Sequence, residues 1–324
     1  MRCPVPRVCA IAVLSRMGSC DERPSAARVI GRGNGPPMSP HTNDRAQRKA
    51  LTAHLYIDQR TIERISCGRP SLDNAGPQQQ DFQAMLATCL MSTYENRHPF
   101  EPPSGGALSS AESYFNTIVS RPGQFDVHTN TACRIAARLL PLLHDGHRVS
   151  GIPGLRLESH NKRRLRLIHL PTGGRLDLID SRASTGRTRR DFRRRLNMET
   201  DWHTDPGIAP LWTSKILLPK ETALAHHWAR RSCTPLRSAL MTRAMLIWYK
   251  LGIKPTWHEP SARRDYPVLL WAPGNEQVDA ARLGRMLTQS PALIPGAVYK
   301  RHNASNGLLI LGTESVVRLR SLTD

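Results

Sequence analysis

Hydrophobic positions follow two different periods along the chain. Up to about residue 144 the apolar residues recur every three to four positions, which is typical of helices that bury one face. Helices are expected there over 44–65, 81–95, 109–119 and 129–144. The last of these has the clearest apolar stripe, formed by Ala132, Ile135, Ala136, Leu139, Leu140 and Leu143.

Between about 154 and 180 the period changes to two. The segments 155–157, 164–168 and 175–179 alternate apolar and charged residues, and turn-forming residues lie between them. This pattern predicts a small antiparallel meander of three strands. One face would carry Leu155, Leu157, Leu165, Leu167, Leu176 and Leu178, and the other Arg156, Arg164, Arg166, Arg175 and Asp177.

The last part of the chain mixes both patterns, and all six tryptophans lie after residue 200. Helices are expected over 220–231, 235–251 and 278–289, and strands over 268–271, 297–300 and 308–311. We find no internal repeat in these patterns. The sequence therefore predicts an α+β protein with a helical N-terminal part, the meander and a mixed α/β C-terminal domain.

The expected boundaries follow from composition. Residues 1–44 are rich in Pro, Gly, Arg and Ser, which predicts a disordered basic tail. Residues 45–199 would form a domain of helices and meander, and 200–324 a tryptophan-containing α+β domain. The seven cysteines form no CxxC pair, which favours reduced thiols and a cytoplasmic location. No apolar run is long enough for a membrane span.

Charge narrows the class of partner. The formal net charge is +20, and 39 of the 46 basic residues are Arg. A codon bias toward Arg explains that ratio as well as phosphate recognition does, but it does not explain the net charge. Residues 148–195 hold 14 basic and 4 acidic residues, half of the excess. A polyanion is the expected partner, and nucleic acid is the commonest one.

The candidate phosphate contacts fall into two groups. The first lies in the basic stretch after the meander and consists of Arg187, Arg189, Arg190, Arg193, Arg194 and Arg195. The second lies on the charged face of the meander and consists of Arg156, Arg164 and Arg166. Phe192 is the only aromatic residue in the basic stretch 181–196, so stacking on single-stranded bases is poorly supported there.

The segment Leu51–Ile65, read with its neighbours over 46–66, resembles a bacterial helix-turn-helix motif. Its apolar residues Leu51, Leu55, Ile57, Ile62 and Ile65 take the core positions of such a motif, and Asp58 would cap the second helix. The resemblance implies that Gln59, Arg60 and Arg64 reach base edges in the major groove. Tyr56 stands where the turn usually has Gly, and an ordinary helical hairpin has the same spacing.

No catalytic, metal-binding or cofactor-binding signature is present in the sequence. Glu158, Asp177 and Asp180 lie on or beside the meander and could gather around a magnesium ion, as in a nuclease. The competing interpretation is that they pair with neighbouring arginines across the sheet.

The sequence thus predicts a nucleic-acid-binding protein, with DNA as the expected ligand and a role in regulation, replication or partition. A metal-dependent enzyme acting on nucleic acid and an RNA-associated structural protein stay open as alternatives. Sequence specificity and oligomeric state are not indicated.

Overall fold

A computed structural model describes most of the chain beyond residue 71. The described residues are 72–73, 75–91, 115–130, 132–161, 163–180, 194, 197, 206–231, 234–258, 266–272, 277–289, 292–313 and 315–322. By its contacts the chain divides into two units, Met1–Ser39 and Pro40–Asp324, and all described residues belong to the second. The expected tail (1–44) and the helix-turn-helix segment (46–66) lie outside them.

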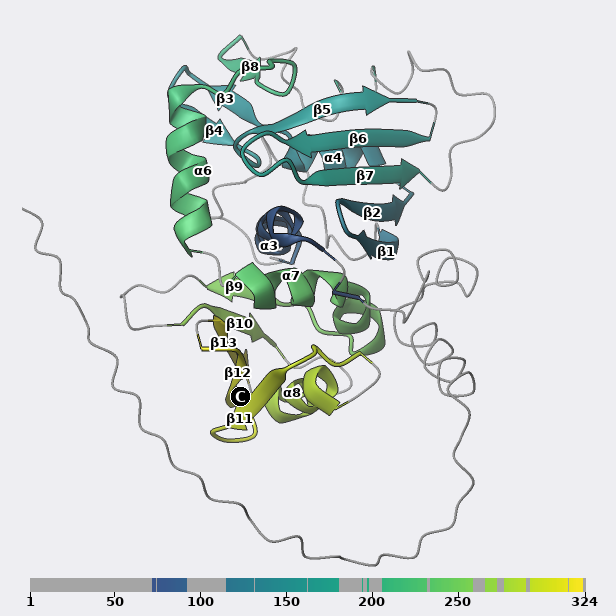
Figure 1. Ribbon diagram of the computed structural model, residues 1–324, viewed down its shortest axis with the longest axis vertical. Helices are drawn as coiled ribbons and strands as arrows, with labels where there is room; N and C mark the ends of the chain where they lie inside the picture. The colour runs from purple at the N-terminus through teal and green to yellow at the C-terminus, as the bar shows by residue number, and fades with distance from the viewer. Residues whose placement is uncertain are drawn as a thin grey trace, which may run out of the picture. The chain divides into compact units, whose positions relative to one another are not determined.

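The described residues form two five-stranded sheets, and the first of them, sheet 1, contains the predicted meander (Figure 1). Its strands are β1 (Phe115–Arg121), β2 (Gln124–Thr129), β5 (Leu155–His160), β6 (Arg164–His169) and β7 (Arg175–Asp180). Their order in the sheet is β1-β2-β7-β6-β5. β5, β6 and β7 pair antiparallel as expected, and β2 adds parallel to β7.

The second sheet, sheet 2, lies in the C-terminal part. Its strands are β9 (Thr256–His258), β10 (Val268–Trp271), β11 (Ala297–Arg301), β12 (Asn306–Leu311) and β13 (Ser315–Ser321), in the order β11-β12-β13-β10-β9. β10 is parallel to β13, and the other pairs are antiparallel. A small third sheet is formed by β3 (Leu142–His144), β4 (Arg148–Ser150) and β8 (Ile208–Pro210).

The helices complete an α+β architecture, as the sequence predicted. They are α3 (Pro77–Leu90), α4 (Ala132–Leu139), α6 (Pro219–Arg231), α7 (Thr234–Thr242), the π-helical turn η2 (Leu246–Lys250) and α8 (Ala280–Gln289). α4 contacts β6 and β7, and α8 contacts β11, β12 and β13. The leucines of the meander meet α4 on the buried face of sheet 1, where Leu165, Leu167, Leu176 and Leu178 are almost fully buried.

The two sheets have the same topology. Each follows a helix (α3 or α7), begins with a two-strand hairpin, continues through a second helix (α4 or α8) and ends in a three-strand meander. In each sheet the last strand of the meander pairs parallel with the second strand of the hairpin. The described part of the chain therefore contains an internal structural repeat, which the hydrophobic patterns of the sequence did not reveal.

A few residues are identical at equivalent positions of the two repeats. Ile152-Pro153-Gly154 and His160-Asn161 recur 142 positions later as Ile294-Pro295-Gly296 and His302-Asn303. Both glycines have a positive φ, 84° and 75°, immediately before the first strand of the meander. This conformation is accessible to glycine at little cost.

The backbone hydrogen bonds repeat with the residues. The amide of Leu155 donates to the Ile152 carbonyl at 3.1 Å, and that of Ala297 donates to Ile294 at 3.0 Å. At the next hairpin, Asn161 donates to Arg164 at 2.9 Å and Asn303 to Asn306 at 3.0 Å. The two meanders thus start and turn in the same way.

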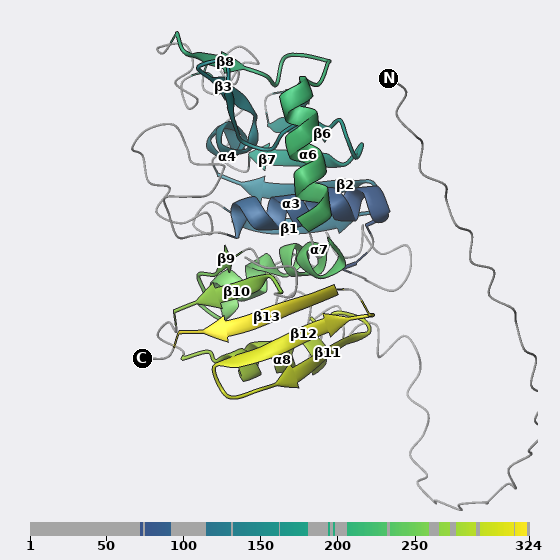
Figure 2. The same cartoon turned by 90° about the vertical axis from the view of Figure 1, so that its left-hand side faces the viewer.

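The first helices of the two repeats, α3 and α7, pack against each other (Figures 1 and 2). Buried polar groups cross this contact: the Ser238 hydroxyl donates to Gln83 Oε1 at 2.7 Å, and Gln83 Nε2 donates to Ser120 at 2.9 Å. An Arg237 guanidinium nitrogen donates to Thr88 at 2.7 Å. Its carbon lies 4.6 Å from the ring centroid of Trp257.

Two expected helices are partly wrong. Residues 115–119 belong to β1, because Phe115, Ile118 and Val119 suit a strand and the turn at Pro122-Gly123 folds β1 onto β2. Helix α4 ends at Leu139, before Pro141, and 142–144 form β3.

Helix α3 starts at Pro77, before the expected start at residue 81, because proline is well suited to the first turn of a helix. The strands β2, β4, β8, β9 and β13 were not expected, and most of them are short or lack alternation.

Packing crosses the boundary expected near residue 200. β8 pairs with β3, and the backbone amide of Leu211 donates to the Pro141 carbonyl at 3.0 Å. The segment 206–226 therefore packs with the first repeat.

His169 on β6 gives the fold a dependence on pH. Its ring is 1% exposed and stacks on Phe82, and burial lowers its pKa from 6.5 to about 4. Nε2 faces the Pro153 carbonyl at 3.0 Å and Nδ1 faces the Thr172 hydroxyl at 2.8 Å, which suits a neutral ring protonated on Nε2.

We expect the stability to fall as the pH is lowered from about 6.5 to 4. In this pH window His169 becomes protonated in the unfolded state but stays neutral in the folded state. The free energy of unfolding is therefore highest above pH 6.5 and falls by up to about 3 kcal/mol as the pH drops to about 4. Urea unfolding across this window measures the loss. His169→Phe keeps an aromatic ring beside Phe82 and should show a shallower dependence, whereas an unchanged slope would contradict the assignment.

Candidate nucleic-acid interface

The side of sheet 1 that faces away from α4 carries charged residues from all five strands. We call this set the polar face of sheet 1. It consists of Arg121, Gln124, Asp126, Glu158, Arg164, Arg166, Arg175 and Asp177.

Asp177 lies at the centre of the polar face, and its side chain is fully buried. Arg166 donates to both of its carboxylate oxygens, from Nε at 3.0 Å and from a terminal nitrogen at 3.1 Å. Arg164 lies 3.2 Å away, and Gln124 Nε2 donates at 2.9 Å. The hydrogen bond to Asp177 raises the pKa of Arg166 above its ordinary value.

A second buried carboxylate, Asp126, stands directly beside Asp177 on the neighbouring parallel strand. Arg121 Nε donates to it at 2.9 Å, and Gln124 also donates to it. Two adjacent buried carboxylates repel each other, and the arginines and the amide that surround them offset this repulsion.

Glu158 completes the network at the edge of the sheet. It lies 3.6 Å from Arg175 and 3.9 Å from Arg166. Glu158 and Asp177 thus pair with arginines across the sheet, as one interpretation of the sequence expected. Among the described residues, no three His, Cys, Asp or Glu side chains are grouped so that they could hold a metal ion.

Arg156 does not lie on an open face, although the alternation of β5 suggested it. Its side chain is 4% exposed and forms a two-pronged ion pair with Glu221 of α6, at 2.7 and 2.9 Å. It also donates to the carbonyls of Ser214 and Ile216. The side chain of Arg156 therefore links β5 to α6, and we do not include it in the candidate nucleic-acid interface.

Glu221 is likewise held in place by several hydrogen bonds. Burial alone would raise its pKa, but hydrogen bonds from Arg156 and from the amides of Gly154 and Leu218 hold the pKa below its ordinary value. This pair positions α6 and the loop before it.

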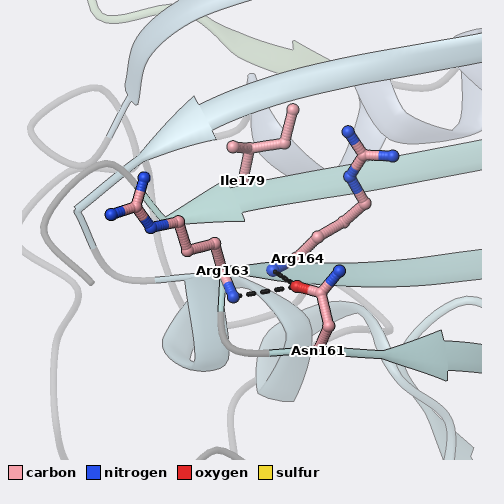
Figure 3. Close-up of a pocket in the computed structure, with 4 residues that line it drawn as sticks. All are labelled: Asn161, Arg163, Arg164 and Ile179. Carbon is pink, nitrogen blue, oxygen red and sulfur yellow. Dashed lines mark hydrogen bonds between the residues drawn. The ribbon is translucent and has the colours of Figure 1, made fainter. Parts of the chain in front are cut away.

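A pocket of about 640 Å³ opens at the tip of the β5–β6 hairpin, lined by Asn161, Arg163, Arg164 and Ile179 (Figure 3). Asn161 Oδ1 accepts the backbone N–H groups of Arg163 and Arg164, both at 2.9 Å, and so shapes the turn. Figure 3 shows the two guanidinium groups on either side of Ile179. The lining has two positive side chains and no acidic one.

The pocket lies where the chain enters its most basic stretch. The amide of Asp180, the last residue of β7, donates to the Arg163 carbonyl at 2.7 Å. The basic stretch begins at Ser181, the residue that follows Asp180 in the sequence. Of its candidate residues only Arg194 is described: it is helical and exposed. Arg187, Arg189, Arg190, Arg193 and Arg195 lie outside the described residues, as do Gln59, Arg60 and Arg64.

The structure thus separates the three candidates of the meander. Arg164 is 43% exposed and lines the pocket, Arg166 is 33% exposed and is held by Asp177, and Arg156 is buried. Sequence reasoning missed Arg163 as a candidate. Its signal was the position between Asn161 and Arg164, in a turn that presents side chains to solvent.

Comparison of the chain with protein-family models, with curated proteins and with solved structures found no match. Within the part of the chain that is described, no helix has the length and apolar character needed to cross a membrane.

We expect Glu221→Gln to lower the free energy of unfolding by about 3 kcal/mol or more, because it leaves the buried charge of Arg156 uncompensated. Glu158→Gln serves as the matched control. Its partners Arg166 and Arg175 are 33% and 47% exposed, so the expected loss is below about 1 kcal/mol. Urea unfolding measures both variants. Equal losses would mean that the buried pair does not hold α6 as described.

Proposed function

We propose that this protein binds DNA through its phosphate backbone. The proposed interface is the Arg163–Arg164 hairpin tip together with the arginine-rich stretch that follows β7. The observation that carries the proposal is the hydrogen bond from Asp180 to Arg163, because it joins the arginine pocket to the start of that stretch.

The distribution of ion pairs supports this choice of residues. Within the polar face three arginines already form ion pairs with carboxylates: Arg121 with Asp126, Arg166 with Asp177, and Arg175 with Glu158. Little net positive charge is therefore left on this face. The uncompensated charge of 148–195 is therefore expected at the hairpin tip and in 181–195. Like charges at this density repel each other unless an anion is present, and phosphate binding releases counterions from DNA.

Contacts of this kind fix position and affinity, and sequence is read at base edges. Any sequence preference would come from elsewhere in the chain, with Gln59, Arg60 and Arg64 of the motif-like segment as the candidates. The described cysteines Cys89 and Cys133 are not joined in a disulfide. A cytoplasmic location is part of the proposal. A role in regulation, replication or partition is part of the proposal.

The first test replaces Arg163 and Arg164 by Gln and measures affinity for duplex DNA over a salt series. The logarithm of affinity should fall linearly with the logarithm of salt for the unchanged protein. In Arg163→Gln/Arg164→Gln this slope should decrease by about 1 to 2, since one or two phosphate contacts are lost.

The matched control is Arg282→Gln/Arg285→Gln, which removes two exposed charges from α8. It should leave the slope nearly unchanged. If the unchanged protein shows no salt dependence, the proposed function is wrong. If both double variants behave alike, DNA binding is not located at the hairpin tip.

The second test replaces Arg193, Arg194 and Arg195 by Gln. Affinity should weaken by a similar factor for DNA duplexes of unrelated sequence, because phosphate contacts carry no sequence information. A structured RNA in the same titration distinguishes the RNA-associated alternative, which predicts equal affinity for both. A change in sequence preference would mean that these residues read bases.

A further inference from the structure

We propose that the outward face of sheet 2 is a second DNA-contacting surface, formed around Lys300, Arg318 and Arg320. This inference rests on the proposed function and locates a separate part of the interface. It follows from comparing equivalent positions in the two repeats.

The face is defined by the alternation of burial along the strands. Leu309, Val317 and Leu319 are fully buried on the side that meets α7 and α8. The residues between them point the other way and are exposed or half-buried. These outward residues are Thr256, His258, Val268, Leu270, Val298, Lys300, Asn306, Leu308, Ile310, Val316, Arg318 and Arg320.

One row of outward residues crosses each sheet and allows a direct comparison. In sheet 1 the row reads Ser159, Arg166, Asp177, Asp126 and Val119 through successive strand pairs. In sheet 2 it reads Lys300, Leu308, Arg318, Val268 and His258.

The equivalence of the two rows rests on the displacement that relates the repeats. Arg166 and Asp126 correspond to Leu308 and Val268 by the same 142 positions. Arg318, the partner of Leu308 and Val268, therefore stands where sheet 1 has Asp177.

The two rows differ in how their charges are balanced. Sheet 1 satisfies its arginines with its own buried carboxylates. None of the five strands of sheet 2 contains Asp or Glu, whereas they contain Lys300, Arg301, Arg318 and Arg320. In sheet 2 the position of the central acid is taken by a base, so the compensating negative charge has to come from outside the sheet.

Arg318 itself has an unsatisfied hydrogen-bond donor among the described residues. Its Nε is buried and has no hydrogen-bond partner within the described part of the chain, and Oδ1 of Asn306, on the neighbouring strand, is also unsatisfied. A buried donor without a partner is costly, and an approaching phosphate that drew the side chain outward would satisfy it.

The spacing and composition fit a duplex backbone. Lys300, Arg318 and His258 stand on alternate strands of one row, so their backbones lie about 10 Å apart. The outward strand positions include no Phe, Tyr or Trp, which argues against stacking of single-stranded bases. Val298, Ile310 and Val316 make one end of the face apolar, and a protein partner is the alternative occupant.

The test compares Arg318→Gln/Arg320→Gln with Arg282→Gln/Arg285→Gln, which removes the same charge from the helix on the other side of sheet 2. A random-sequence DNA duplex and an RNA duplex of the same sequence are titrated over a salt series. The sheet variant should bind DNA at least about fivefold more weakly than the control, with a slope smaller by about 1 to 2. Arg318→Lys/Arg320→Lys should restore most of the affinity.

The other possible results of this test contradict either this inference or the proposed function, and they can be told apart. If the unchanged protein binds DNA with salt dependence but the two Gln variants agree, this inference is wrong and the proposed function stands. If the loss is confined to RNA, or sedimentation shows a changed oligomeric state with DNA affinity intact, the face serves another partner. Circular dichroism checks folding, and if the double variant is unfolded, the exposed Lys300→Glu replaces it and should weaken DNA binding by a similar factor.

Discussion

The contact between α3 and α7 is the constraint on which both halves of the fold depend. Each of these helices opens one repeat, and their facing surfaces combine small residues with a buried polar network of Gln83, Ser238, Arg237 and Thr88. Hydrogen bonds between buried groups need particular distances and angles, so this network favours one relative placement of the two helices over others. The ring of Trp257 under Arg237, with its Nε1 bonded to the Ala87 carbonyl, extends the same network from the second sheet to the first helix.

The two repeats share a backbone plan but balance charge in opposite ways. Asp126 and Asp177 in sheet 1 are buried beside each other and are stable only because arginines surround them. This makes Arg166 structural, although the sequence marked it as a phosphate contact. Sheet 2 has an apolar side chain at Val268 and a base at Arg318 in the corresponding places, so it carries positive charge without an internal counterion. If the repeats arose from one ancestral unit, their outward faces have diverged while their cores have kept the same pairing.

The sequence predicts the elements whose patterns are local and leaves out those set by distant partners. The meander was predicted strand by strand because alternation over 154–180 is strong, and α6, α8 and β10 to β12 were placed within a few residues. Most of β1 was expected to belong to a helix over 109–119, and only its pairing with β2 shows that it is a strand. The burial of Arg156 depends on Glu221, 65 residues away, so alternation on β5 could not reveal that its outward side is covered. The repeat was visible as Ile-Pro-Gly and His-Asn at a spacing of 142, but too few residues match to show it without the strand order.

The same reasoning bears on which positive charges are available to a ligand. An arginine in a basic stretch contributes to anion binding only to the extent that no internal carboxylate already holds it, because breaking a buried pair costs more than one phosphate contact returns. By this criterion Arg156 and Arg166 are unavailable, Arg164 is shared between Asp177 and the pocket, and Arg163 is available. On sheet 2 the criterion selects Lys300, Arg318 and Arg320, since its strands offer no acid to occupy them. Net charge therefore favours the class of partner that we propose, and the internal ion pairs decide which positive charges the proposed interface can use.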